Sequence, residues 1–167
     1  MALFHHPVAR AAEPLTPGAE PALTGPTAQE WAQVWFGVQR REWESLALVP
    51  AGRRGSSVGA ARAMLDVAQQ YHLLAVRLLD ASPARPADTA ALIGRMRDGA
   101  LVGERTIVAL ASPLASPSSI PIARAASAAV LVVTLGATRA QDALATIAAV
   151  GREHFAGCIV VRGGGTS

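Results

Sequence analysis

From residue 45 onward, short apolar runs alternate with longer amphipathic segments, and this alternation constrains the fold more than any other feature. Apolar runs of roughly 4–8 residues are typical of buried strands, whereas apolar residues recurring every three or four positions indicate helices. Strands that alternate with helices form right-handed β-α-β units, which give a parallel sheet covered on both faces. We therefore expect an α/β domain with three α-β-α layers and a mostly parallel sheet of about five strands.

The pattern also sets the expected boundaries of the domain. Residues 1–26 are rich in Pro, Ala and Gly and show no hydrophobic period, so we expect a flexible tail there and a frayed, flexible end at 163–167. A single domain is expected over 27–162, with an N-terminal helix at 27–42 and the sheet core at 45–162. The expected strands are 46–49, 73–79, 106–110, 130–134 and 158–161. The expected helices are 57–71, 88–97 (capped by Asp88) and 139–150, with a short helix or turn at 120–126.

The N-terminal helix carries an unusual aromatic load. Thr27 and Glu30 have the spacing of a capping box, in which each side chain accepts a hydrogen bond from the other residue's backbone amide. Trp31 and Trp35 fall on one helical face with Val34 and Val38. This face either packs against the core of the domain or forms a docking surface for a protein partner, since Trp is favoured at interface hot spots. Trp31 and Trp35 are therefore candidate partner-binding residues.

Composition excludes several function classes. All 15 basic residues are arginines, and they are scattered, so the net charge of +3 does not form the clustered basic face expected of a nucleic-acid-binding protein. No apolar stretch reaches the roughly 18 residues that span a bilayer, and no signal peptide is recognisable at the N-terminus. The single cysteine, Cys158, excludes an intramolecular disulfide, and its apolar neighbours predict a buried structural thiol. A cytoplasmic location is expected.

The loop after the first expected strand stands where a parallel sheet binds its ligands, beyond the carboxyl ends of the strands. It is rich in glycine and precedes a helix, as a phosphate-binding loop does. A working loop of that kind needs a lysine for the outer phosphates and then a Ser or Thr for magnesium, and the chain has no lysine. We interpret it as a vestigial phosphate loop comprising Gly52, Arg53, Arg54, Gly55, Ser56 and Ser57.

Short motifs follow the later expected strands in a fixed order. The second strand is followed by Asp80-Ala81-Ser82 and Arg85-Pro86, and the third by Ala111-Ser112-Pro113-Leu114. The rest of the chain contains Ala126-Ser127-Ala128, Gly136-Ala137-Thr138-Arg139 and Phe155-Ala156-Gly157. With these motifs, residues 27–161 resemble the cytoplasmic kinase-like domains of bacterial exopolysaccharide and capsule synthesis, of the tyrosine-autokinase type, within the MinD/ParA-like group of P-loop ATPases.

The resemblance implies a P-loop NTPase-like fold, and its motifs stand in the family's order but are individually incomplete. In the family the first two motifs are Asp-x-Asp followed by Arg-Pro, and Asp-Thr-Pro-Pro. The later ones are an Ala-Asp-Gly step, a Thr-containing loop and a Phe-x-Gly step.

The departures from the family coincide at its catalytic groups. The phosphate-loop lysine is absent, the second signature aspartate is Ser82, and the aspartate that organises magnesium is Ala111. Phosphoryl transfer depends on these charges, so we expect no hydrolysis, no catalytic residue, no metal and no cofactor. Asp80 is either a vestigial acidic site or a turn acceptor at the end of a strand.

The expected function is that of a non-catalytic pseudo-ATPase, a regulatory partner protein in bacterial polysaccharide synthesis or export. It would dock onto a membrane component or a kinase-like subunit, which would place it at the inner membrane through that partner, and self-association is a further option. The alternatives are a divergent nucleotide-binding switch that uses Arg53 or Arg54, since guanidinium is a good phosphate ligand, and an adaptor in protein positioning.

Overall fold

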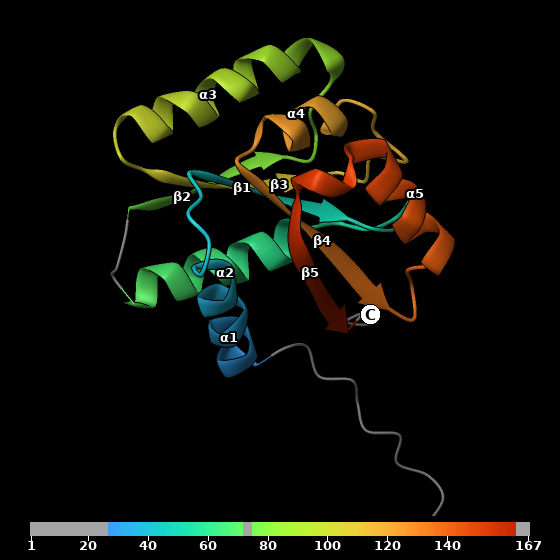
Figure 1. Ribbon diagram of the computed structural model, residues 1–167, viewed down its shortest axis with the longest axis horizontal. Coiled ribbons are helices and arrows are strands. Elements are labelled where there is room, and N and C mark those ends of the chain that lie inside the picture. Colours follow the sequence, from blue (N-terminus) through green and yellow to red (C-terminus); the bar gives the residue numbers. More distant parts are fainter. Residues whose placement is uncertain (1–26, 72–74, 163–167) are drawn as a thin grey trace, which may run out of the picture.

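Five parallel strands form one sheet, in the order β2-β3-β1-β4-β5, in the computed structural model, which describes residues 27–71 and 75–162 (Figure 1). The expected α/β fold class, with a parallel sheet between layers of helices, is confirmed. The expected flexible ends, and the start of the strand expected at 73–79, lie outside the described residues. In chain order the elements are α1 (Ala28–Val38), β1 (Ser45–Pro50), α2 (Val58–Tyr71), β2 (Val76–Ala81), the 3-10 turn η1 (Pro86–Asp88), α3 (Thr89–Leu101), β3 (Arg105–Leu110), α4 (Ser119–Ala125), β4 (Ala128–Leu135), α5 (Ala140–Val150), the 3-10 turn η2 (Arg152–His154) and β5 (Phe155–Arg162).

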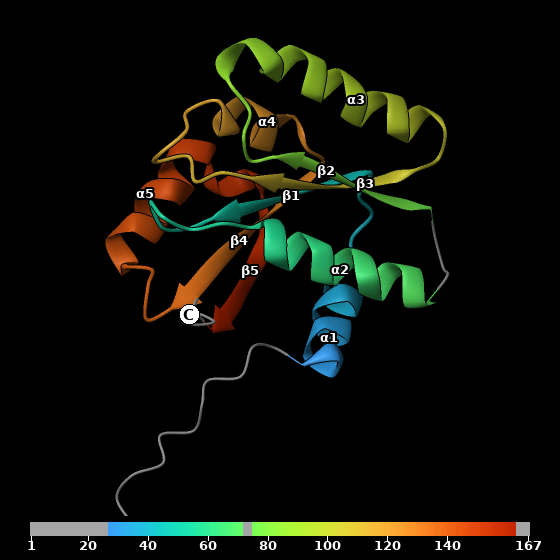
Figure 2. The same ribbon diagram turned by 180° about the vertical axis from the view of Figure 1, so that it is seen from behind.

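The helices divide unequally between the two faces of the sheet, as Figures 1 and 2 show from opposite sides. On one face α1 and α2 pack over a cluster that includes Leu46, Leu48 and Met64. On the other face α3, α4 and α5 pack over a cluster that includes Val49 and Ile122. Alternate residues of β1 thus enter opposite clusters, and every residue of β1 is buried, as expected for the middle strand of a sheet covered on both sides.

Strand β1 holds the sheet together at its centre. It pairs in parallel with β3 on one side, where Leu46 lies opposite Ile107, and with β4 on the other, where Leu48 lies opposite Val130. The helix that follows β1 covers one face of the sheet, whereas the helices that follow β3 and β4 cover the other. The loops leaving the carboxyl end of β1 and of its neighbours therefore diverge, and this divergence is the topological switch point at which open parallel sheets bind ligands.

The capping box at the start of α1 is confirmed. The Glu30 carboxylate accepts the Thr27 backbone N–H at 2.6 Å, and the Thr27 hydroxyl accepts the Glu30 N–H at 3.3 Å. Because the Thr27 amide donates to it, the pKa of the Glu30 carboxyl is lowered from its ordinary value. The helix ends at Val38, earlier than the expected boundary at residue 42, and the chain then turns so that Trp43 meets Trp35 edge to face, with ring centroids 6.0 Å apart.

Two local predictions were wrong. Asp88 does not cap α3 with its side chain; its carboxylate instead accepts the Arg85 N–H at 3.0 Å, because the 3-10 turn η1 lies directly before the helix. Cys158 is a free thiol as expected, but it is exposed, because β5 lies at the edge of the sheet and not at its centre. An apolar run has the same composition in either position. The partial burial of Cys158 raises the pKa of its thiol.

Candidate functional site

The loop between β1 and α2, which the sequence predicts to be a vestigial phosphate loop, lies at the switch point of the sheet. Its turn is closed by the Gly55 N–H, which donates to the Gly52 carbonyl at 2.9 Å. A Cβ on Gly55 would stand 2.8 Å from the Pro50 Cβ and 3.1 Å from the Gly52 oxygen. Any larger residue would therefore force the turn open, which explains why glycine is needed at position 55.

The end of this loop is fastened to β3. Ser57 is completely buried, and its hydroxyl donates to the Leu110 carbonyl and accepts the Leu110 N–H, both at 2.9 Å. Ser56, one residue earlier, forms an isolated antiparallel bridge with Ala111. The single hydroxyl proton of Ser57 is thus directed at a backbone carbonyl, and the side chain ties the start of α2 to the carboxyl end of β3.

Helix α5 and the segment between β4 and α5 cover the start of the loop. The Thr146 Oγ1 of α5 lies 3.2 Å from the Ala51 carbonyl oxygen and 2.9 Å from the Asp142 carbonyl oxygen, so its single proton is shared between these two acceptors. A Cβ on Gly52 would stand 3.5 Å from the Thr138 Oγ1, so this hydroxyl lies close over the glycine. The Thr138 Oγ1 also accepts the Thr134 N–H at 3.0 Å, which fixes its position. The Thr-containing segment 136–139 singled out in the sequence therefore lies next to the β1–α2 loop.

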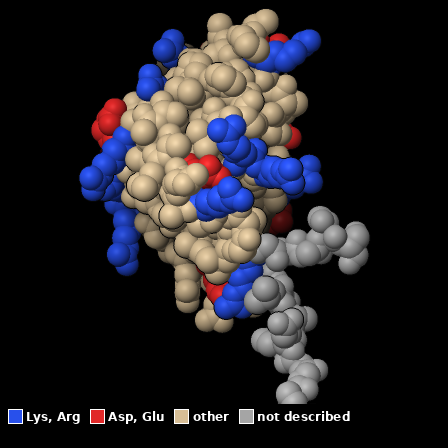
Figure 3. Space-filling view, turned by 90° about the vertical axis from the view of Figure 1, so that its right-hand side faces the viewer, with Lys and Arg blue, Asp and Glu red and all other residues tan. Residues whose placement is uncertain are grey.

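Arg53 and Arg54 are the exposed residues of this loop between the fastened ends. In the described part of the chain neither forms an ion pair or a side-chain hydrogen bond. Figure 3 looks at the side of the molecule toward which the strands run and shows basic side chains around a small acidic patch. Guanidinium groups exposed at a switch point can bind an anion by charge and by paired hydrogen bonds.

Asp80, at the carboxyl end of β2, is exposed and accepts two hydrogen bonds from within its own turn. The Ser82 N–H donates to its Oδ1 at 3.0 Å and the Ser82 hydroxyl at 2.6 Å. Because β3 lies between β2 and β1, Asp80 is separated from the β1–α2 loop by two strand spacings, roughly 10 Å. This geometry is that of a turn acceptor, the second of the two roles expected for Asp80. Ala111, at the end of β3, carries no group that binds a metal.

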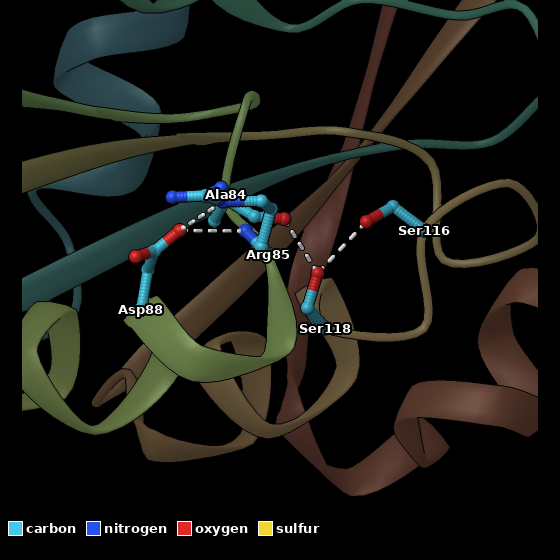
Figure 4. A network of polar contacts seen from close by, with 5 residues as sticks. All are labelled: Ala84, Arg85, Asp88, Ser116 and Ser118. Carbon is cyan, nitrogen blue, oxygen red and sulfur yellow. Dashed lines mark hydrogen bonds and ion pairs between the residues drawn. The ribbon is translucent and has the colours of Figure 1, made fainter.

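A polar network that was not predicted from the sequence joins the loops after β2 and β3 (Figure 4). The Ser118 hydroxyl donates to the Ala84 carbonyl at 2.8 Å and lies 2.8 Å from the Ser116 hydroxyl. On the other side of Ala84, the Asp88 carboxylate accepts from the Arg85 backbone amide and side chain. These bonds lower the pKa of the Asp88 carboxyl. The Pro/Ser-rich composition of 112–119 was the available signal, and the network gives that composition a structural role.

The two candidate partner-binding tryptophans occupy different environments. Trp35 is 1% exposed and belongs to the core, so its place favours packing, the first of the two alternatives for this helix face. Trp31 is half-buried and lines a small cavity of about 80 Å³ between α1 and the carboxyl half of β5. Of the two, Trp31 alone is placed where a partner can touch it.

Among the described residues no three His, Cys, Asp or Glu side chains lie close enough together to hold a metal ion. Within the same residues, none of the helices combines the length and the apolar character needed to cross a bilayer. Compared with protein-family models and with curated proteins, the chain matches none.

Proposed function

We propose that this chain is a non-catalytic α/β domain, a pseudo-ATPase that acts as a regulatory interaction partner in a bacterial polysaccharide synthesis or export assembly. The observation that carries the non-catalytic part is the position of Ser57. A phosphate loop of the P-loop type needs a hydroxyl free to bind magnesium at the start of the following helix. The Ser57 hydroxyl is completely buried and bonded to both backbone groups of Leu110.

The other charges that phosphoryl transfer needs are also missing or engaged. The chain has no lysine to neutralise the outer phosphates. The oxygen Oδ1 of Asp80 is held by Ser82, and alanine stands at position 111. Removing one such contact commonly lowers the rate by two to three orders of magnitude, about 10²–10³, and here three are changed together. The assignment to polysaccharide assembly depends on the resemblance of residues 27–161 to the kinase-like domains of that machinery.

The catalytic part is tested by measuring phosphate release from ATP and GTP with magnesium, at high protein concentration, over several hours. We expect no release above that of the Ser57→Ala variant, in which the candidate magnesium hydroxyl is removed. Turnover by the unaltered chain that disappears in this variant would refute a non-catalytic domain.

The partner is tested by co-purification with the kinase-like and membrane components of a polysaccharide export system from the same organism. We expect a complex that is weakened by Trp31→Ala, since this side chain is accessible beside α1. A matched control is Leu144→Ala, which removes a 67% exposed apolar side chain from α5 on the other face of the sheet. Absence of a complex with every component would refute the assignment to this machinery.

A second candidate function is a nucleotide-binding switch without hydrolysis, and the free, exposed Arg53 and Arg54 favour it. Titration calorimetry with ATP, ADP and GTP tests it directly. Binding that is lost in Arg53→Gln/Arg54→Gln but retained in Arg95→Gln/Arg97→Gln, a matched pair on α3, would support the switch. No heat at millimolar nucleotide would eliminate it. An adaptor in protein positioning remains a third proposal, tested by the same co-purification with positioning proteins as bait.

A further inference from the structure

A cavity of about 470 Å³ lies between α5 and the amino half of β5, on the face of the sheet opposite α1 and α2. Sites for small molecules usually enclose about 300–1,000 Å³. A helix is about 10–12 Å across with its side chains, so two turns of a partner helix would need a larger volume. The cavity therefore has the size for a small molecule. Its walls come from Leu131 of β4, Leu144 and Ile147 of α5, and Phe155 and Cys158 of β5, with Arg152 of η2 at one end.

The walls of the cavity are apolar. Leu144 and Ile147 lie three residues apart on one face of α5, and Leu144 is 67% exposed. Cys158 lies opposite Leu131 in the pairing of β4 with β5, and its neighbour Ile159 belongs to the cluster under α1 and α2. Because successive strand residues point to opposite faces, the Cys158 thiol lies on the α5 side, in the wall of the cavity. A molecule that covers these walls gains about 25 cal/mol for each Å² of apolar surface removed from water.

One positive charge stands at the end of these walls. Arg152 is exposed, and it is the only charged side chain among the described residues that line the cavity. It forms no ion pair within the described part of the chain. The carboxylate of the adjacent Glu153 lies 3.7 Å from the His154 Nε2 and does not belong to the lining. The lining therefore leaves the charge of Arg152 without a counter-ion.

The apolar walls extend away from this charge along both elements. Helix α5 returns from the carboxyl end of β4 to the amino end of β5, so Arg152 lies at the amino end of β5. Residues 144–150 of α5 span about 9 Å, and residues 155–158 of β5 span about 10 Å. An extended chain advances about 1.2 Å per bond, so a hydrocarbon chain of about eight bonds covers this distance.

We propose that this cavity binds a small amphipathic anion, a free hydrocarbon chain of about 8–10 carbons that ends in a carboxylate or a phosphate group. The chain lies along Leu144, Ile147 and Phe155, and its anionic end pairs with Arg152. A guanidinium group forms paired hydrogen bonds with either anion. A neutral amphiphile of the same length makes the apolar contacts alone and binds less tightly. This inference goes beyond the proposed function, because it concerns a different surface and does not depend on what the β1–α2 loop binds.

The Cys158 thiol reports whether the cavity is occupied, because it is the only thiol of the chain and lies in the wall. The full chain is alkylated with iodoacetamide, and the rate is followed by mass spectrometry with octanoate present below its micelle concentration. At ten times the dissociation constant of octanoate we expect alkylation to slow about tenfold, since only the unoccupied protein reacts. Acetate, which carries the same anion without the chain, should leave the rate unchanged.

Titration calorimetry with octanoate and octan-1-ol separates the role of the charge from that of the walls. Arg152→Gln should raise the dissociation constant of octanoate at least about tenfold and leave that of octan-1-ol unchanged. Leu144→Gln should weaken the binding of both. Arg97→Gln, at an exposed position of α3, is the matched control and should change neither. All three side chains are exposed, so circular dichroism and the thermal midpoint serve to confirm that each variant is folded.

Three results would overturn the inference. The first is the absence of octanoate binding at millimolar concentration. The second is equal affinity of the unaltered chain and Arg152→Gln for octanoate, because the charge would then have no part in recognition. The third is binding to vesicles of anionic phospholipid without binding of free octanoate, because this face would then contact a membrane surface and not a free molecule.

Discussion

Replacing Ser57 by alanine should destabilise the domain far more than the loss of one small polar side chain suggests. The Ser57 hydroxyl is the hydrogen-bond partner of both the N–H and the C=O of Leu110, at 2.9 Å each, in a site with no solvent exposure. Alanine leaves both backbone groups without this partner. A buried polar group left without a hydrogen bond costs about 1–3 kcal/mol, so two groups with partial relaxation predict a loss of about 2–4 kcal/mol.

The loss is measured by urea denaturation, followed by circular dichroism and by the fluorescence of the buried tryptophans. We expect a lower transition midpoint with an unchanged dependence on urea, because the surface exposed on unfolding stays the same. For a domain of this size the thermal midpoint should fall by roughly 5–15 °C.

The matched control is Ser56→Ala, one residue earlier in the same loop. Ser56 is exposed, and its hydroxyl accepts only the Val58 N–H, at 3.3 Å. Its removal should change the free energy of unfolding by no more than about 0.5 kcal/mol. Equal effects of the two substitutions would refute the reasoning, because they would mean that the contact of Ser57 with β3 adds nothing to stability.

Three further predictions concern local structure, each measured as a change in the free energy of unfolding. Gly55→Ala should destabilise the domain by about 1–3 kcal/mol, because the new methyl group clashes within the turn. Gly59→Ala, where the new methyl group has no atom within contact distance, should stabilise α2 by about 0.5–1 kcal/mol. A stabilising Gly55→Ala together with a destabilising Gly59→Ala would contradict the geometry of the turn. The folded-state pKa of Glu30 is lowered, so its contribution to the free energy of unfolding is fully present above the ordinary value of 4.5 and is lost as the pH falls through the lowered pKa. The difference in the free energy of unfolding between the unaltered chain and Glu30→Gln should therefore shrink below pH 4.5. A difference that grows there would refute the capping role of the carboxylate. The Arg124 guanidinium donates to the carbonyls of Val150 and Ala149 at the end of α5, at 2.8 and 2.9 Å. Arg124→Leu removes both hydrogen bonds and should destabilise the domain by about 1–3 kcal/mol. Arg62→Leu, on the exposed side of α2, is the control and should leave the free energy of unfolding unchanged.

The alternation of apolar runs and amphipathic segments was sufficient to predict the layers of the fold, because both periods arise from local geometry. It was also sufficient to place the 52–57 loop after the first strand and before a helix. It could not predict the order of the strands, since β1 pairs with β3 and β4 through contacts that are distant in the sequence. The predicted burial of Cys158 was wrong for this reason, because an edge strand and a central strand can have the same apolar composition.

The candidate site was only partly predictable. The sequence supplied the residues that stand at the switch point, including Arg53 and Arg54, but not the bonds that determine what those residues can do. The buried hydroxyl of Ser57 has the same sequence signal as the exposed hydroxyl of Ser56. Every residue has a backbone carbonyl, so the sequence does not indicate which carbonyl a serine hydroxyl will bond. The hydrogen bonds of Ser57 to Leu110 and of Ser118 to Ala84 could therefore not be predicted.

The central place of β1 also affects how the chain folds as it is synthesised. This strand is made before the other four, yet its neighbours β3 and β4 follow only after two and three further helices, so its apolar residues have no neighbouring strand to pair with in the meantime. Closing such long loops before any pairing is gained makes folding slow. A nascent chain that ends before Ala128 still lacks one of the two neighbours of β1, so both sides of this strand can be paired only late in synthesis.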